Sequence, residues 1–248
     1  MSLIKSIDLN CDLGEGYDDA TIMAYISSCN IACGGHCGNA ETVEQSILLA
    51  LTNHVAIGAH PAYPDKENFG RKSMDIELDQ LTASISEQIE RVYKTCEKHK
   101  TKLHHIKLHG ALYNDTAQDM DLAIAIFRTI QAIVPDTLLY VLADSQASAA
   151  AQFLGMHYYN EVFADRAYES RSSLRSRKLA GAVISDWNMI RAQLDHYMSN
   201  QLSDYYGNLH TLSSDTICLH SDTAAAVTLA KNIHHYIHSK DVRISSDS

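Results

Sequence analysis

The sequence predicts a parallel α/β protein, and three observations lead to this expectation. Short apolar runs alternate with longer amphipathic segments from one end of the chain to the other, as in repeated strand–helix units. About seven such units occur, and this number suits a closed (β/α) barrel better than an open sheet. The 248 residues contain only three prolines and no low-complexity linker, so we expect a single domain spanning residues 1–248.

The expected strands are the short apolar runs, most of them followed by polar or glycine-rich residues. Their regular alternation with helical segments is what indicates a parallel sheet. They cover Ile4–Leu9, Asn30–Cys33, Val55–His60, His105–His109, Leu138–Ala143, Tyr158–Ala164 and Ile217–His220, and Ala182–Ile184 is a candidate eighth strand.

The expected helices lie between these strands. The clearest one begins at Asp79, where apolar side chains recur every three or four residues, which is the spacing of a buried helix face. In chain order the helices cover Glu41–Thr52, Asp79–Lys98, Asp121–Ile133, Gln146–Phe153, Asp186–Met198 and Thr223–Ile237.

The composition excludes several classes of protein. Apolar residues at 46% and charged residues at 20% are typical of a globular chain and not of a disordered one. The net charge of −10 disfavours nucleic acid as a partner, because binding to a phosphate backbone needs a basic face. No apolar stretch is long enough to span a membrane, and the segment Met1–Ile7 lacks the apolar core of a secretory signal. We therefore expect a cytoplasmic protein.

Six cysteines are present, and in the cytoplasm we expect them to be reduced. Cys29, Cys33 and Cys37 recur every four residues, which is not the close-paired spacing of a structural zinc site, although a metal or redox role stays open. His234 and His238 lie one helical turn apart; we expect them on a solvated helix face, with metal chelation as the alternative.

Two common catalytic loops are missing from the sequence. The glycines of Gly14-Glu15-Gly16 are not followed by the further glycine and lysine of a phosphate-binding loop, so we expect them to form a tight strand-to-helix turn. No G-x-S-x-G segment exists, which disfavours a serine hydrolase of the α/β type.

Polar side chains gather at the expected carboxyl ends of the strands, where barrel enzymes hold their active sites. Successive side chains of a strand point to opposite faces, so Asp8, Asn10 and Asp12 share one face. Any single polar residue could be a solvated rim residue, but several strands repeat the pattern, and buried charge must be paired or used. We therefore expect these faces to point into the barrel. The corresponding sets on the other strands are Ala56, Gly58 and His60, then His105, Lys107 and His109, then Cys218, His220 and Asp222.

Two glycine- or proline-rich turns each carry a histidine after a strand, namely His36 and His60. Together with Asp12 they could form a metal site of two imidazoles and a carboxylate. Arg71 follows soon after and offers a cation for a substrate carboxylate. A second source of positive charge is the segment 166–178, which holds five basic residues and one acidic residue; it is either a solvated loop or a site of anion capture or partner docking.

Taken in order, these segments resemble the LamB/YcsF (lactam-utilisation) family over nearly the whole chain. The sequence departs from the family pattern at Gly35, Cys37, Asn39, Leu108, Arg171, Ser172 and Ser221. The matching blocks are Asp8 to Glu15, Asn30 to Gly34 with His36, Gly58 to Pro61 with Tyr63 to Asp65, Phe69 to Arg71, Lys107 with His109 to Asn114, Glu161 to Tyr168, Gly181 to Ile184, and Ile217 and Cys218 with His220 and Asp222.

The resemblance implies a (β/α) barrel related to the glycoside hydrolase and deacetylase superfamily. It also implies ATP-dependent opening of the lactam ring of 5-oxoproline to give L-glutamate, in a complex completed by 5-oxoprolinase subunits B and C. ATP is then a co-substrate handled by the partner subunits, which agrees with the missing phosphate-binding loop. Two alternatives stay open: a metal-dependent deacetylase or amidohydrolase on the same barrel, with Asp12, His36 and His60 as ligands, or a non-catalytic substrate-binding subunit.

Hydrolysis of a lactam needs a base for water, a stabilised oxyanion and a proton for the leaving nitrogen. We expect Asp12, and second to it Asp8, as the base, with Lys107 and His109 stabilising the oxyanion. Lys107 should have a carboxylate partner in Asp8, Asp12 or Glu161, because an unpaired buried lysine would lose its charge. The expected catalytic residues are Asp12, His60, Lys107 and His109, and the expected substrate-binding residues are Asp8, Asn10, Asn30, His36, Arg71, Asp165, Arg166 and His220.

Overall fold

The predicted (β/α) barrel is confirmed. The computed structural model describes residues 4–222 and 225–247, and seven parallel strands close into a barrel because the last of them pairs with the first. In order around the barrel these strands are β1 (Ser6–Leu13), β2 (Ser28–Ala32), β3 (Ala56–His60), β4 (His105–Lys107), β5 (Leu138–Leu142), β6 (Tyr158–Phe163) and β11 (Thr216–His220).

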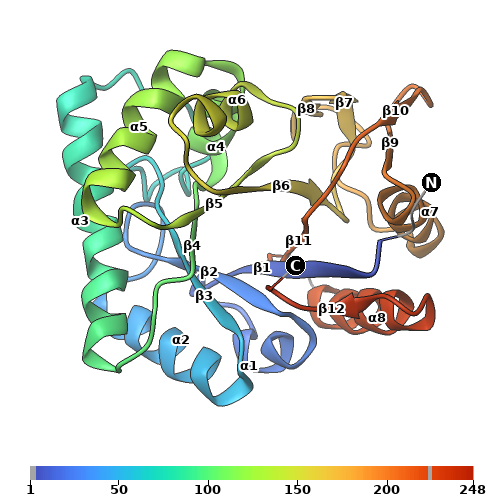
Figure 1. The fold of residues 1–248 in the computed structure, drawn as a ribbon, viewed down its shortest axis with the longest axis horizontal. Helices are drawn as coiled ribbons and strands as arrows, with labels where there is room; N and C mark the ends of the chain where they lie inside the picture. Colours follow the sequence, from blue (N-terminus) through green and yellow to red (C-terminus); the bar gives the residue numbers. More distant parts are fainter. Residues whose placement is uncertain (1–3, 223–224, 248) are drawn as a thin grey trace.

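Helices cover the outside of the barrel, with α2, α3 and α5 along one side and α7 and α8 along another (Figure 1). The predicted helix from Thr223 begins at Ala226 within the described residues, and Thr223 itself lies outside them. The helices are α1 (Asp19–Ile22), the short 3-10 helix η1 (Met23–Tyr25), α2 (Ala40–Asn53), α3 (Leu78–Lys98), α4 (Gly110–Gln118), α5 (Met120–Ile133), α6 (Gln146–Phe153), α7 (Trp187–Met198) and α8 (Ala226–Ser239).

Side chains that cap the first turn determine where several helices begin. The Asn39 side chain accepts hydrogen bonds from the backbone N–H groups of Glu41 and Thr42 at the start of α2. Asp119 caps α5 and Asp186 caps α7 in the same way. These caps satisfy N–H groups that have no partner inside the helix, and each contributes about 1 kcal/mol.

The strands separate an apolar layer from a polar interior, as their alternation predicts. On β1, Leu9 and Cys11 belong to the hydrophobic core under the helices, whereas Asn10 hydrogen-bonds across the barrel to Glu161 of β6. Gly58 leaves the space that the His105 ring fills, since a Cβ at Gly58 would overlap that ring. The barrel interior is therefore a packed polar core that leads up to the carboxyl ends of the strands.

Two predicted strand ends and one candidate strand are wrong. The first strand continues to Leu13 instead of ending at Leu9. The fourth strand ends at Lys107, because Gly110, at a φ of +58°, begins the unpredicted helix α4 directly afterwards. The candidate strand Ala182–Ile184 is no barrel strand; its Val183 forms an isolated antiparallel bridge with Arg166.

Two short antiparallel pairs of strands lie outside the barrel and were not predicted. They lie in polar segments without the alternation that marks a strand. The pairs are β7 (Tyr168–Ser170) with β8 (Ser173–Leu174) and β9 (Gln201–Ser203) with β10 (Leu209–Thr211). Separately, the two-residue strand β12 (Arg243–Ile244) pairs in parallel with the start of β1.

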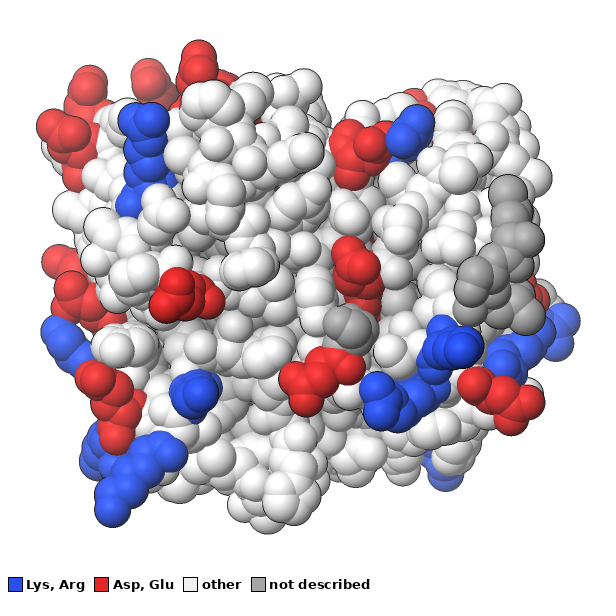
Figure 2. All heavy atoms as spheres, viewed as in Figure 1, with Lys and Arg blue, Asp and Glu red and all other residues white. Residues whose placement is uncertain are grey.

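On the face shown in Figure 2, acidic and basic side chains are interspersed and form no continuous basic area. None of the helices within residues 4–222 and 225–247 has the length and apolar character needed to cross a membrane. All six cysteines belong to the described part of the chain and are unpaired.

Candidate active site

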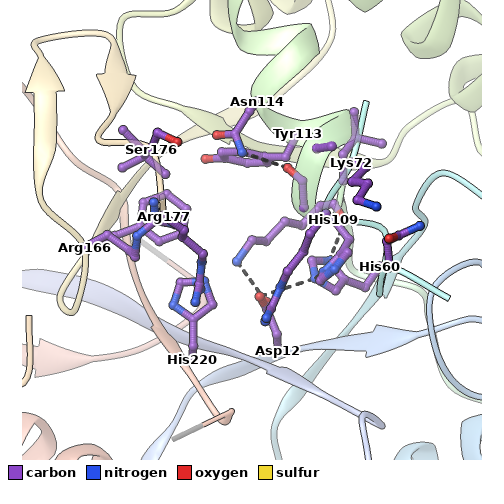
Figure 3. Close-up of a pocket in the computed structure, with 18 of the residues that line it drawn as sticks. Asp12, His60, Lys72, His109, Tyr113, Asn114, Arg166, Ser176, Arg177 and His220 are labelled. Atoms are coloured by element: carbon purple, nitrogen blue, oxygen red, sulfur yellow. Dashed lines mark hydrogen bonds and ion pairs between the residues drawn. The ribbon is translucent and has the colours of Figure 1, made fainter. Parts of the chain in front are cut away.

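A pocket of about 550 Å³ opens at the carboxyl ends of the barrel strands. Asp12 and His60 form its floor, His109 follows β4 on one side, and His220 ends β11 on the other (Figure 3). Lys107 also lines the pocket and contacts Asp12 on the floor. All five were expected to share one cavity, and the structure confirms that they do. A volume of this size lies within the roughly 300–1,000 Å³ of ligand-binding clefts.

Lys107 is the central charge of the floor. Its Nζ lies 2.9 Å from Asp12 Oδ1 and 2.9 Å from Glu161 Oε1, and it also donates to Cys218 Sγ at 2.9 Å. Burial is the largest single influence and would lower the pKa of this ammonium group, but Asp12, Cys218 and Glu161 together outweigh burial and hold the pKa well above its ordinary value. The predicted carboxylate partner is therefore confirmed as Asp12 and Glu161, and Asp8 is not one.

Asp12 is held ionised by its neighbours. Oδ1 accepts hydrogen bonds from Lys107 and from Asn30 Nδ2 at 2.8 Å, and Oδ2 lies 3.3 Å from His60 Nε2. Burial would raise the pKa of Asp12, but His60 and Lys107 lower it well below its ordinary value. Both carboxylate oxygens are engaged by these neighbours, so the geometry gives Asp12 the role of holding Lys107 and His60 in place.

His60 and His109 point at each other across the floor. His60 Nδ1 donates to the Lys107 carbonyl oxygen at 2.8 Å, and His109 Nε2 donates to the Phe69 carbonyl oxygen at 3.0 Å. Because a carbonyl only accepts, each of these nitrogens must carry a hydrogen. The remaining nitrogens, His60 Nε2 and His109 Nδ1, lie 2.9 Å apart. Burial, together with His36 and His60, holds the pKa of His109 well below its ordinary value, so its imidazole is neutral at pH 7.

Glu15 and His36 back this pair. His36 Nε2 lies 2.9 Å from Glu15 Oε1, and the His36 ring stacks on that of His109 with centroids 3.6 Å apart. Burial lowers the pKa of His36. His36 does not line the pocket, whereas Glu15 does. Glu15 was interpreted only as part of a turn, although its position directly after the carboxyl end of β1 was a signal for the site.

His220 is fixed from behind by Asp165. His220 Nδ1 lies 2.9 Å from Asp165 Oδ1, and the backbone N–H of His220 donates to Asp165 Oδ2. Burial would raise the pKa of Asp165, but His220 lowers it below its ordinary value. Asp165 therefore positions the imidazole of His220 and does not itself line the pocket.

Asn10 and Asn30 lie beneath Asp12 and Asp8 lies a further layer down the barrel, and none of the three lines the pocket, so the prediction that Asp8 and Asn10 line the cavity is wrong. Two residues along a strand move a side chain by roughly 6.6 Å, which is a full layer of the barrel. Asp8 accepts hydrogen bonds from the hydroxyl groups of Ser27, Ser28 and Thr216, and burial raises its pKa. Direct contact of this layer with a substrate is therefore not supported by the structure.

Basic side chains surround the mouth of the pocket. Arg71 is paired with Asp222, which also lies 3.6 Å from Arg177 Nη1. Arg166 donates to the carbonyl oxygens of Ala182 and Arg175, so its guanidinium also holds the loop together; burial lowers the pKa of Arg166 to about 10. The basic residues that line the pocket are Arg71, Lys72, Arg166, Arg175, Arg177 and Lys178.

The structure changes the expected metal ligands. Among the described residues, Asp12 and His60 group with His109 and not with His36, with the three ligand atoms within 4.8 Å of one another. His36 groups instead with Glu15 and His109. The reason is that His36 lies behind Glu15, whereas His109 follows β4 directly onto the floor.

A closed parallel barrel whose ionisable side chains converge at the strand carboxyl ends defines a (β/α)-barrel protein with an enzyme-like pocket. The LamB/YcsF family model matches residues 7–248, and the chain belongs to this family.

Similar proteins agree with this assignment. The chain is 40% identical over 242 residues to the 5-oxoprolinase A subunit of Erwinia tasmaniensis, covering 97% of this chain and 99% of that protein. It is 39% identical over 237 residues to the 5-oxoprolinase A subunit of Shouchella clausii, covering 93% of this chain and 94% of that protein. The crystal structure of the lactam utilization protein from Thermus thermophilus superposes with a TM-score of 0.90 at 29% identity, covering 97% of this chain and 99% of that one.

Proposed function

We propose that this chain is the A subunit of an ATP-dependent 5-oxoprolinase, the component that hydrolyses the lactam of 5-oxoproline to L-glutamate. The names of its full-length relatives support the assignment. The observation that carries it is the pocket floor, where a charged lysine and two facing imidazoles lie together beneath a basic mouth. This arrangement suits a small anionic amide. ATP occurs in the cytoplasm, where we place the reaction.

The basic mouth and the floor have separate roles in the proposed reaction. Arg71 and Arg177 lie at the mouth, where a guanidinium fork can hold the carboxylate of 5-oxoproline. The lactam ring then points toward Lys107, whose ammonium stabilises the negative charge that develops on the carbonyl oxygen. Asp12 keeps that ammonium charged and in place.

The imidazoles move the protons. The His60–His109 pair accepts a proton from the attacking water, whose oxygen bonds to the lactam carbonyl carbon. The bond between this carbon and the ring nitrogen breaks, and His220, on the opposite side of the pocket, gives the nitrogen a proton. The product is glutamate with a free amino group. This assigns the base to the histidine pair in place of Asp12.

Partner subunits B and C complete the proposed enzyme by handling ATP. A five-membered lactam is a resonance-stabilised amide with little strain, so its carbonyl needs activation before water can add. The sequence contains no phosphate-binding loop to supply that activation from within this chain.

The test is glutamate formation from 5-oxoproline and ATP, with this chain alone, with the partner subunits alone and with all subunits together. We expect turnover only when all are present, and loss of turnover with His109→Ala in the complete mixture. Full turnover by the partners alone would show that this chain is not needed for the reaction, and full turnover by the complex with His109→Ala would show that the histidine pair is not its base.

A further inference from the structure

The pocket floor brings several electron-rich atoms together without a hydrogen to place between them. His60 and His109 each use one ring nitrogen to donate to a backbone carbonyl oxygen. Their other nitrogens, His60 Nε2 and His109 Nδ1, are therefore lone-pair acceptors when the rings are neutral. These two acceptors face each other at 2.9 Å, where two lone pairs repel.

Two carboxylate oxygens lie close to the same two ring nitrogens. Asp12 Oδ2 lies 3.3 Å from His60 Nε2, and Glu15 Oε1 lies 3.7 Å from His109 Nδ1. A cation at this point would turn the repulsion into attraction. A single shared proton would serve the two imidazoles alone, whereas a metal ion would serve the imidazoles and a carboxylate at once.

We propose that the pocket floor is a binding site for one divalent transition-metal ion, with Asp12, His60 and His109 as its ligands. Two imidazoles and one carboxylate are a donor set that suits Zn²⁺ and its first-row neighbours. All three residues line the pocket, so a further coordination position faces the open cavity, as in catalytic and not structural sites.

The surroundings of the three ligands match those of a metal centre. Each imidazole is oriented by a backbone carbonyl on its far nitrogen, which is the usual outer partner of a metal-bound histidine. Asp12 is oriented by Asn30 and Lys107, both on Oδ1, so Oδ2 remains directed at His60. The ligands are therefore held before the ion arrives.

Two other triads of candidate ligands fit less well. Glu15 and His36 already form an imidazole–carboxylate hydrogen bond of 2.9 Å, which needs no ion. Cys218 groups with Asp12 and His220, but the Lys107 ammonium lies 2.9 Å from its sulfur and occupies that position with a positive charge. Of these three groups of described residues, the Asp12–His60–His109 triad has the closest facing acceptors, two ring nitrogens 2.9 Å apart.

A metal ion here would occupy the two free ring nitrogens of the His60–His109 pair, so it would take over the activation of water from that pair by lowering the pKa of a bound water. That role rests on the proposed function, because the site is the same pocket. Binding of the ion itself can be measured without turnover, so the two proposals can fail separately.

The test is calorimetric titration of the full chain, freed of metal by a chelator and dialysis, with Zn²⁺, repeated with Co²⁺ by absorption spectroscopy. We expect one equivalent to bind the wild type, and His60→Ala or His109→Ala to weaken binding by more than about 100-fold, since loss of an outer partner alone costs roughly 10–100-fold. The Co²⁺ complex should lack the charge-transfer absorption of a cobalt–thiolate bond, which excludes Cys218. That spectrum is measured on the wild type, so it holds even if a variant fails to fold.

Two control variants separate this site from others. His36→Ala removes a member of the neighbouring triad and should keep stoichiometric binding. His238→Ala removes one of two histidines of α8 whose rings lie 4.6 Å apart on the surface, and it should leave tight binding unchanged. No stoichiometric binding by the wild type, a thiolate band, or binding lost in His36→Ala or His238→Ala but retained in His60→Ala would overturn the proposal.

Discussion

Lys107 contacts two carboxylates inside the barrel, and its removal should affect activity and stability separately. Lys107→Met keeps the length and removes the charge. If the ammonium stabilises the transition state, the barrier should rise by roughly 2–4 kcal/mol, as for the loss of one oxyanion donor. Stability should also fall by roughly 3–5 kcal/mol, because Asp12 and Glu161 are left buried without their cation.

The measurements are kcat/KM in the complete enzyme and urea denaturation of the chain. Lys94→Met is the matched control, since Lys94 pairs with Glu90 on the exposed surface of α3. Near-normal turnover by folded Lys107→Met protein would remove Lys107 from the mechanism.

Asp165 should make the protein sensitive to acid. Its folded pKa is below the ordinary value, despite burial, because His220 faces it. The unfolded chain binds the proton more tightly, so the stabilisation is complete above the unfolded pKa of about 3.9 and is lost as the pH falls through the folded value. Between about pH 5 and pH 3, the free energy of unfolding should fall more steeply for the wild type than for Asp165→Asn. Equal slopes in urea denaturation would contradict the assignment.

At the residue scale, the sequence predicted which side chains face inward but not which of them meet. Strand alternation placed Asp12, Lys107 and Asp8 on inward faces, and this is correct. Alternation carries no information on depth, so Asp8 was expected in the pocket although it lies two layers below Asp12 on the same strand. The pairing of His60 with His109 instead of His36 depends on a loop and a helix start, which follow no period.

Among the elements, the start of α4 controls the position of His109. Gly110 has a φ of +58°, and a Cβ there would lie 2.5 Å from the Gly70 carbonyl oxygen. Gly155 has a similar φ of +66° but open space around it. In both Gly110→Ala and Gly155→Ala, backbone strain should lower the free energy of unfolding by about 1–2 kcal/mol. In Gly110→Ala the clash should lower it by roughly 1–3 kcal/mol more.

Activity should separate these variants further. Gly110→Ala displaces the Phe69–Arg71 turn, which holds both the His109 ring and a mouth arginine, so kcat/KM should fall by at least about tenfold. Gly155→Ala should keep its kcat/KM. Equal losses of stability and activity in the two variants would show that α4 does not position the site.

The helices and strands whose apolar residues recur at a regular spacing were the ones that could be predicted from the sequence. The amphipathic spacing of α3 and the apolar runs of the barrel strands gave their types correctly. Helix α4 was hidden because His109, Gly110 and the residues after them continue an apolar run from β4. The β7–β8 and β9–β10 pairs are too short to show any alternation.

For the molecule as a whole, we expect that the isolated chain neither binds ATP tightly nor hydrolyses it. The sequence contains no phosphate-binding loop, and the net charge of −10 disfavours a polyanion. Calorimetry with ATP and a phosphate-release assay on the purified chain test this division of labour. Micromolar binding or steady phosphate release by the chain alone would contradict it.

The most direct test of the account is turnover of 5-oxoproline by the complete enzyme carrying Asp12→Asn, compared with Asp195→Asn. Asp12 holds Lys107 and His60 at the pocket floor, whereas Asp195 is a surface carboxylate that pairs with Lys240 and Tyr236. Both variants should assemble with the partner subunits. We expect Asp12→Asn to lose at least about 100-fold in kcat, by the loss of roughly 3 kcal/mol of transition-state stabilisation, and Asp195→Asn to match the wild type. Wild-type kcat in an assembled Asp12→Asn enzyme would contradict the claim that this pocket is the active site.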